Sequence, residues 1–329
     1  MKWFLRITGA LLAVLVILFL VFRTPDTDPA AMRAKYGGEP SQFVAIEGGV
    51  TVHLRDEGPK DSEAVPIVLL HGSNADLYTW QSWVEGLRAD RRVIRFDQVG
   101  HGLTGPDPEH DYSRDNYASD IAQVMDALEI ERAIIGGNSM GGKHALAFAV
   151  AYPDRVAGLV LVDASGAPLP EDETEEDDDS GNIGFAIAQT PGLNRIAEQI
   201  TPRSLIKQSL EQSVSVQSVV SEEAVDRYWE LLRYPGNRAA TMARFSNPYD
   251  PLSEAEIASV SVPTLILWGE EDRLIPLAAG EWLDRVMPAT TFVAYPKIGH
   301  LPQEEAPKAT LESLNAWLSN AELTTQSSE

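Results

Sequence analysis

The sequence of 329 residues predicts a mostly parallel α/β sheet with helices on both faces and an inserted helical cap. Three observations predict this fold class. Short apolar runs alternate with amphipathic stretches, a glycine-rich turn joins one such run to a helical stretch, and one long interval contains no strand-like run. Buried runs separated by helices are typical of parallel sheets that are covered on both faces.

A hairpin is expected first, because Gln42–Ile46 and Val50–Leu54 flank Glu47-Gly48-Gly49. It would form the antiparallel edge of the sheet. The parallel strands are predicted at Ile67–Leu70, Val93–Phe96, Ala133–Ile135, Leu159–Val162, Leu265–Trp268 and Phe292–Ala294. The helices between them are predicted at Trp80–Leu87, Asn116–Leu128, Gly142–Ala151, Leu277–Val286 and Ala306–Trp317.

The interval without strands covers residues 168–250. It begins with an acidic run at residues 171–179, where like charges repel one another and favour a solvated loop. Short helices are predicted after that run, at Ile183–Gln189, Arg203–Leu210, Ala224–Leu232 and Arg238–Phe245. We interpret residues 168–250 as a helical cap inserted into a core of residues 41–167 and 251–320. Residues 321–329 are expected to be a disordered tail.

The first residues have a different composition. An uncharged run of 16 residues, Ile7–Phe22, is preceded by Lys2 and Arg6 and followed by Arg23. The run predicts a membrane anchor within residues 1–23, with a cleaved signal as the alternative. Positive charge before the run predicts a folded domain on the outer side, periplasmic or extracellular, or secreted after cleavage. Residues 24–40 are rich in proline and glycine and are expected to be a linker.

The overall composition excludes several classes of function. A formal net charge of −23 argues against binding of nucleic acid, because phosphates require a basic surface. The absence of cysteine excludes a thiol nucleophile, a cysteine-ligated zinc ion and an iron–sulfur cluster. We expect no metal and no cofactor, and the sequence does not specify an oligomeric state.

The strongest local signal is Gly137-Asn138-Ser139-Met140-Gly141, which lies between a predicted strand and a predicted helix. A sharp strand-to-helix turn of this kind projects the serine hydroxyl above the sheet. Because a serine hydroxyl is a weak nucleophile, it needs a general base. His300 lies in the loop after the last predicted strand and is the candidate base for Ser139.

The base in turn needs a carboxylate that orients it. Asp272 follows the penultimate predicted strand, and Asp163, which follows the strand before it, is the rival. Ligand sites gather at the carboxyl ends of strands in open α/β sheets. We therefore predict Asp272 as the acid, with Asp163, Glu270 and Glu271 as alternatives.

A developing oxyanion needs hydrogen-bond donors. One donor is expected to be the backbone amide of Met140, directly after the serine. The other is expected from the loop after the first parallel strand, where Gly72 allows close approach and Ser73 or Asn74 would supply the amide.

Substrate contacts are predicted for Gly72, Trp268 and Leu301. In the cap, Phe185–Ala188 and Tyr228–Leu232 are expected either to line an apolar pocket or to pack the cap onto the sheet.

Other polar residues of the loops are expected to have structural roles. These are His53, His71, His144 and Asp97, whereas His101 could approach the pocket.

Taken together, the motifs resemble the α/β-hydrolase superfamily over roughly residues 42–320. The matching pieces are His71-Gly72, Asp97-x-x-Gly100-x-Gly102, the Ser139 turn, Gly269-x-x-Asp272 and Gly299-His300. The resemblance implies a serine hydrolase that works through an acyl-enzyme with a Ser-His-Asp triad.

The resemblance extends to particular subfamilies. Ser139 stands where haloalkane dehalogenases and epoxide hydrolases have an aspartate, which disfavours both. The segment around Ser139, with Trp268, is similar to the meta-cleavage-product hydrolases, which split carbon–carbon bonds, although Leu301 stands where they commonly have tryptophan. The layout also resembles monoacylglycerol-lipase-like esterases.

These resemblances leave three functions open. The substrates of meta-cleavage-product hydrolases are anionic and fit poorly with so acidic a chain. We therefore predict hydrolysis of a neutral carboxylic ester, amphiphilic or short-acyl. Carbon–carbon hydrolysis of the meta-cleavage-product type is the alternative, and a non-catalytic ligand receptor on the same fold is the alternative of another class.

Overall fold

The computed structural model describes residues 2–167, 198–246 and 251–320. Three predicted features therefore lie outside the described residues. These are the acidic loop at residues 171–179, the first cap helix at Ile183–Gln189 with its Phe185–Ala188 segment, and the tail at residues 321–329.

An eight-stranded sheet forms the centre of the molecule, with the strand order β1-β2-β4-β3-β5-β6-β7-β8. Strand β2 pairs antiparallel with β1 and β4, and the other pairs are parallel. The bounds are β1 (Ser41–Ala45), β2 (Thr51–Glu57), β3 (Ile67–Leu70), β4 (Val93–Phe96), β5 (Ala133–Asn138), β6 (Val156–Val162), β7 (Thr264–Gly269) and β8 (Thr290–Tyr295). The predicted fold class is confirmed, including the hairpin at the antiparallel edge.

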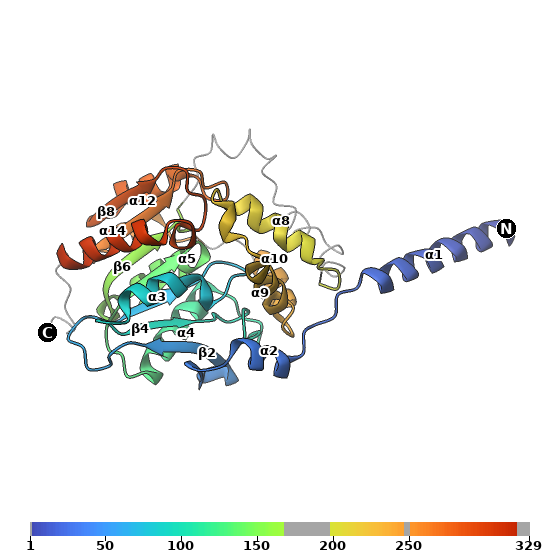
Figure 1. Ribbon diagram of the computed structural model, residues 1–329, viewed down its shortest axis with the longest axis horizontal. Helices are drawn as coiled ribbons and strands as arrows, with labels where there is room; N and C mark the ends of the chain where they lie inside the picture. The colour runs from blue at the N-terminus through green and yellow to red at the C-terminus, as the bar shows by residue number, and fades with distance from the viewer. Residues whose placement is uncertain (1, 168–197, 247–250, 321–329) are drawn as a thin grey trace.

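Helices cover both faces of this sheet (Figure 1). Adjacent strand residues such as Leu69 and Leu70 belong to different apolar clusters, because successive side chains of a strand point to opposite faces. One face packs against α4, α5, α11 and α12, and the other packs against α3 and α14. The bounds are α3 (Gln81–Leu87), α4 (Arg114–Ala127), α5 (Met140–Ala151), α11 (Glu254–Ser259), α12 (Leu277–Val286) and α14 (Pro307–Asn320).

Between β6 and β7 the described chain forms α8 (Arg203–Ser213), α9 (Glu222–Leu232) and α10 (Asn237–Ser246), close to the predicted ranges. These helices dock on loops at the carboxyl ends of the strands. On α9, the guanidinium of Arg227 donates to Asp76 in the loop after β3, at 3.0 Å. After α8, the amide of Ser215 donates to Glu305 on α13 (Pro302–Glu305), at 2.8 Å.

The prediction that residues 24–40 form a linker is only partly right, since Pro29–Tyr36 form helix α2. Asp28 caps this helix by accepting the amide of Ala31, and Pro29 supplies a first residue whose backbone angle suits a helix. The segment before α2 is tied to the cap helices, because Asp26 pairs with Arg238 of α10 at 2.6 Å.

The N-terminal helix α1 (Lys2–Phe22) extends away from the body of the molecule (Figure 1). The prediction of a membrane anchor is wrong: none of the helices in the described part of the chain combines the length and apolarity needed to cross a bilayer. The uncharged run of 16 residues is shorter than the roughly 20 that a span requires. The predicted placement of the folded domain on the outer side of a membrane depended on that anchor and is withdrawn with it.

Candidate active site

Ser139 lies at the turn between β5 and α5, with φ 54° and ψ −120°. A positive φ is uncommon for a residue with a side chain and marks local strain. The turn is closed by glycines: a Cβ at Gly137 would lie 2.2 Å from Gly141, and a Cβ at Gly141 would lie 2.3 Å from the Leu70 carbonyl oxygen. The sequence thus folds into the sharp strand-to-helix turn that the motif predicts.

The ring of His300 contacts Asp272, with Nδ1 and Oδ2 2.7 Å apart. The other carboxylate oxygen of Asp272 accepts the amides of Leu274 at 2.8 Å and Ile275 at 3.1 Å. These two backbone donors and the ring fix the orientation of the Asp272 carboxyl group. The structure therefore brings together the predicted acid and the predicted base.

His300 is also held next to the Ser139 turn. The side-chain amide of Asn138 donates to the His300 carbonyl oxygen at 3.1 Å, and the His300 amide donates to Ser213 at the end of α8. Within the described residues, no hydrogen bond joins the Ser139 hydroxyl to the His300 ring. Such contacts are often long before substrate binds and shorten in the reacting complex.

Two backbone amides flank Ser139. Met140 is the first residue of α5, so its amide has no acceptor within the helix. The loop after β3 passes close by, since a Cβ at Gly72 would lie 3.2 Å from the Ser139 Cβ. Among the described contacts, neither the Met140 amide nor the Ser73 amide donates a hydrogen bond. Asn74 follows with φ 58°, and its side-chain oxygen accepts from Thr241 of α10 at 2.9 Å.

Gln98 braces this loop and was missed by the sequence analysis. Its amide donates to the His71 ring at 3.0 Å, its side chain donates to the His71 carbonyl, and its side-chain oxygen contacts the His144 ring at 2.6 Å. The His101 ring lies edge-on to His71 at 4.9 Å. Burial lowers the pKa of His71, His101 and His144, so these rings are neutral supports.

A second serine–histidine–aspartate arrangement lies at the edge of the sheet formed by β1 and β2. The His53 ring contacts Asp97 Oδ2 at 2.7 Å and Ser41 Oγ at 2.9 Å. Asp97 also accepts the amides of Leu77 at 2.9 Å and Leu103 at 2.8 Å. This agrees with the bracing roles predicted for His53 and Asp97.

Trp268 and Leu301, which are predicted to contact substrate, are both buried in the structure. Trp268 is fully buried on β7, and its indole N–H donates to the Ile275 carbonyl at 3.1 Å, so it supports the loop that carries Asp272. Leu301 is also buried, and its amide donates to Glu305 at 3.1 Å.

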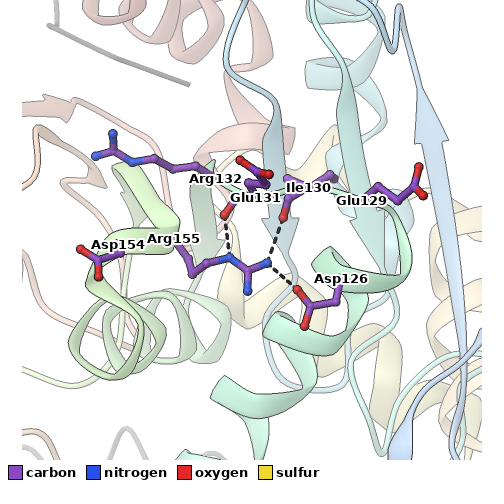
Figure 2. A pocket seen from close by; sticks show the side chains of 7 residues that line it. All are labelled: Asp126, Glu129, Ile130, Glu131, Arg132, Asp154 and Arg155. Carbon is purple, nitrogen blue, oxygen red and sulfur yellow. Dashed lines mark hydrogen bonds and ion pairs between the residues drawn. The ribbon is translucent and has the colours of Figure 1, made fainter. Parts of the chain in front are cut away.

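Figure 2 shows the residues that line a hollow of about 500 Å³. Because they precede β5 and β6, the hollow lies at the opposite end of these strands from Ser139, which follows β5. It is lined by Asp126, Glu129, Ile130, Glu131, Arg132, Asp154 and Arg155, which precede β5 and β6. The Arg155 guanidinium is engaged by Asp126 at 2.7 Å and by the Glu131 and Ile130 carbonyls at 2.6 and 2.9 Å. Its cation therefore has a structural role there.

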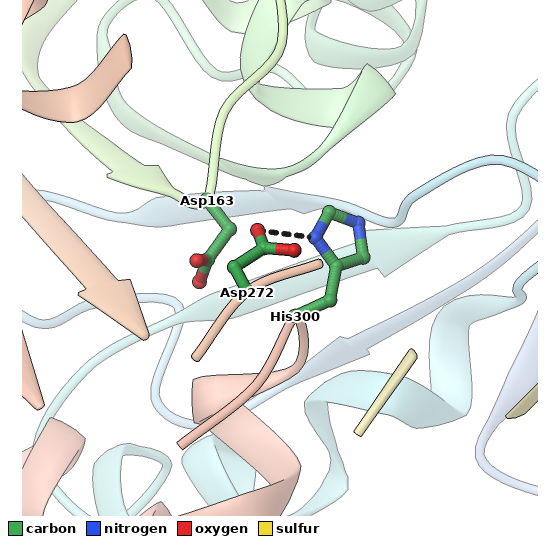
Figure 3. A group of neighbouring side chains, drawn as sticks. All are labelled: Asp163, Asp272 and His300. Atoms are coloured by element: carbon green, nitrogen blue, oxygen red, sulfur yellow. Dashed lines mark hydrogen bonds and ion pairs between the residues drawn. The ribbon is translucent and has the colours of Figure 1, made fainter. Parts of the chain in front are cut away.

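Asp163, Asp272 and His300 are the one group in the described chain whose ligand atoms, all within 4.8 Å of one another, are spaced to hold a metal ion (Figure 3). His300 and Asp272 contact each other directly at 2.7 Å. Two donors around one tetrahedral zinc ion lie about 3.3 Å apart. The arrangement thus fits a hydrogen-bonded acid–base pair better than a metal centre.

The fold and the site define a hydrolase of the α/β type. Residues 65–307 match the α/β-hydrolase fold family, and the chain belongs to it. It is 28% identical to a 2-hydroxy-6-oxo-2,4-heptadienoate hydrolase of Pseudomonas putida. The 284 aligned residues cover 84% of this chain and 95% of that protein.

Solved structures give the same picture. A meta-cleavage product hydrolase of Pseudomonas fluorescens superposes with a TM-score of 0.70 at 27% identity, over 84% of this chain and 97% of its own. A thermophilic esterase of Thermogutta terrifontis superposes with a TM-score of 0.66, also at 27% identity, over 84% of this chain and 98% of its own.

Proposed function

We propose that the chain is a serine hydrolase that cleaves a carbon–carbon bond next to a ketone, in a substrate of the 2-hydroxy-6-oxo-dienoate type. The observation that carries the proposal is the strained Ser139 turn, flanked by unpaired amides and by a histidine that is hydrogen-bonded to Asp272. The substrate class is supported by the likeness to hydrolases of this kind over more than four-fifths of the chain.

In the proposed reaction, His300 takes the proton of Ser139 as Oγ adds to the 6-oxo carbon. The Met140 and Ser73 amides stabilise the oxyanion, and Asp272 stabilises the charged imidazole. Carbon–carbon cleavage requires the 2-oxo tautomer of the substrate, in which the 2-hydroxyl has lost its proton and C5 has gained one. The C5–C6 bond then breaks, and its electron pair passes through the C3–C4 double bond to the 2-oxo oxygen, which gives a dienolate. His300 protonates that fragment.

Water completes the cycle. His300 removes a proton from water, which attacks the acyl group on Ser139 and releases a carboxylic acid. As part of this proposal we keep the division into a core of residues 41–167 and 251–320 and a cap of residues 168–250. Leu231 of α9 belongs to an apolar cluster with Met32 and Leu103, which supports a packing role for Tyr228–Leu232.

Hydrolysis of a neutral carboxylic ester is the second candidate. It would use the same residues, because an ester also passes through an acyl-enzyme. The net charge of −23 opposes an anionic substrate, and the Thermogutta esterase is as similar in sequence as the carbon–carbon hydrolase of known structure.

The test compares kcat/KM of the full chain for 2-hydroxy-6-oxohepta-2,4-dienoate, followed by loss of its conjugated chromophore, with that for p-nitrophenyl acetate. We expect a preference of about 10²-fold or more for the dienoate. The reverse preference would favour the ester hydrolase.

A fluorophosphonate probe tests the nucleophile independently of substrate. It should label wild-type protein at Ser139 and fail to label Ser139→Ala. Absence of labelling and of turnover, together with thermal stabilisation by the dienoate, would favour the non-catalytic receptor.

A further inference from the structure

Asp163 is a buried carboxyl that the proposed reaction does not use. It follows the last residue of β6, has φ 42° and is fully buried. Its Oδ1 accepts the amide of Gly269 at 3.0 Å. Its Oδ2 is buried and meets no N–H or O–H donor among the described residues, so that a hydrogen bond with Asp272 requires a proton on one of the two carboxyls. A buried carboxyl oxygen without a donor is costly, which suggests a role beyond packing.

The sheet places this carboxyl beside the acid of the active site. Strands β6 and β7 are parallel neighbours with Val162 opposite Leu267, so their carboxyl ends lie side by side. One ligand atom each from Asp163, Asp272 and His300 lies within 4.8 Å of the others. In Figure 3, Asp163 and His300 lie on either side of Asp272.

Two buried carboxyls at this separation cannot both ionise without a large electrostatic cost. We expect the negative charge on Asp272 rather than on Asp163. Asp272 accepts hydrogen bonds from two backbone amides and from the His300 ring, whereas Asp163 accepts one from a backbone amide. Burial and the charge of Asp272 raise the pKa of Asp163 well above its usual range.

Two further titratable groups lie near Asp163, and one of them acts in the same direction. Glu305 of α13, which accepts the amides of Gly299 and Ser215, also disfavours a negative charge on Asp163. Tyr295 at the end of β8 is also near, and because burial raises its pKa it stays neutral and places no charge beside Asp163. No cation among the described residues pairs with Asp163, so no positive charge stabilises its ionised form.

We propose that Asp163 is a positioning residue which holds the one proton of a carboxyl pair with Asp272, so that a single negative charge faces His300. The effect of Asp163 on catalysis rests on the proposed function. Asp163 stays neutral while Asp272 orients the imidazole, and it ionises when the charge of Asp272 is removed. The carboxyl end of β6 thus supplies a second acid within reach of the same base.

The first test asks for the protonation state and does not require activity. Carbon NMR titration of aspartate carboxyls in wild-type protein and Asp163→Asn assigns the Asp163 signal by difference. We expect a protonated Asp163 at neutral pH. An ionised Asp163 there overturns the proposal, whether or not the chain is a hydrolase.

The second test is the pH profile of kcat/KM. Asp163→Asn replaces one neutral group by another, so the acidic limb should move by less than about half a pH unit. If Asp163 carries a charge in the wild type, its removal should move that limb to lower pH by about one unit or more, which overturns the proposal. Asp120→Asn is the matched control, because Asp120 is also buried with an unpartnered oxygen but lies on α4.

The third test is a double-variant comparison at alkaline pH. Asp272→Asn should keep at least about 10-fold more kcat/KM than Asp163→Asn/Asp272→Asn, since Asp163 can then ionise beside His300. Equal activity of the two variants overturns the proposal. Fluorophosphonate labelling of Ser139 in the wild type reports separately on the proposed function.

Discussion

Two Ser-His-Asp arrangements lie in the described part of this chain, and the one with the more complete hydrogen-bond chain is not at the predicted nucleophile. At the edge of the sheet, His53 contacts both Ser41 at 2.9 Å and Asp97 at 2.7 Å. At the carboxyl ends of β5, β7 and β8, His300 contacts Asp272 at the same 2.7 Å, and Ser139 lies one residue from Asn138, which holds the His300 backbone.

The difference lies in the backbone of the serine. Ser41 is paired within β1, opposite Arg55, whose guanidinium donates to the Ser41 hydroxyl at 3.1 Å. Ser139 has a positive φ, and a helix begins directly after it, so unpaired amides stand beside its hydroxyl. A histidine–aspartate pair orients whatever it touches, but the turn and the amides are what allow an oxyanion to form. We therefore expect chemistry at Ser139 and bracing at Ser41.

Exchange of each serine tests this comparison most strongly. Ser139→Ala should lower kcat/KM by about 10⁴–10⁶-fold, because the nucleophile is lost. Ser41→Ala, the matched control, should leave turnover and Ser139 labelling unchanged and cost about 1 kcal/mol of unfolding free energy, the typical contribution of a hydrogen bond. Labelling that persists in Ser139→Ala and disappears in Ser41→Ala would reverse the assignment.

The two aspartates give the next largest contrast. Asp272→Asn should reduce kcat by about 10³–10⁴-fold, since an amide cannot stabilise the charged His300 ring and can favour the wrong tautomer. Steady-state kinetics and thermal unfolding of the same sample separate lost chemistry from lost fold. A large loss of stability with little change in kcat would mean that Asp272, like Asp97, is a brace.

Asp97→Asn should show the opposite pattern, a loss of stability with kcat nearly unchanged in the folded fraction. The asparagine amide would meet donors from His53 and Leu103, which should cost about 3 kcal/mol at neutral pH. Although burial raises the pKa of Asp97, the charge and hydrogen bond of His53 outweigh it, and the folded pKa is lowered.

The pH dependence of that loss follows from its sign. A lowered folded pKa contributes stability fully above the unfolded value of about 4 and loses it as the pH falls through the folded value. The difference between wild type and Asp97→Asn in urea unfolding should therefore shrink in acid. A difference that grows as the pH falls would contradict an ionised Asp97.

The sequence was sufficient for the sheet and for the pairing of His300 with Asp272, whereas the nucleophilic role of Ser139 stays a prediction. Apolar runs such as Ile67–Leu70 and Val93–Phe96 are strands with the predicted bounds, because both faces of those strands are buried and the pattern is unambiguous. His300 and Asp272 could be paired from their order and from the strands that they follow, since the carboxyl ends of parallel strands meet at one edge.

What the sequence did not predict depends on contacts between distant residues. Ser41 and Asp97 are far apart in sequence, and the motif that begins at Asp97 does not predict that both residues contact His53. The sequence predicts Asp163 only as an alternative to Asp272 for the acid that orients His300. It cannot show that both carboxyls lie beside this one histidine. Helix α2 was overlooked because its proline and the glycine after it suggested a linker, although Asp28 and Pro29 form a helix start.

The smallest effect that would sharpen the comparison concerns the space around Ser139. A Cβ at Gly72 would lie 3.1 Å from the Asn138 side-chain oxygen and 3.2 Å from the Ser139 Cβ. Gly72→Ala should push these neighbours by a few tenths of an ångström and lower kcat/KM by about 10-fold, since a misplacement of 1 Å can cost about 10².

Gly38→Ala is the matched control for this change, because a Cβ there meets nothing within 4 Å. It should leave kcat/KM and labelling as in the wild type. The Ser41 arrangement has no counterpart of this crowding, since its serine lies in a regular strand. If Gly72→Ala is as active as Gly38→Ala, the loop after β3 does not constrain Ser139. That result would contradict the proposed role of the Ser73 amide as a hydrogen-bond donor to the oxyanion.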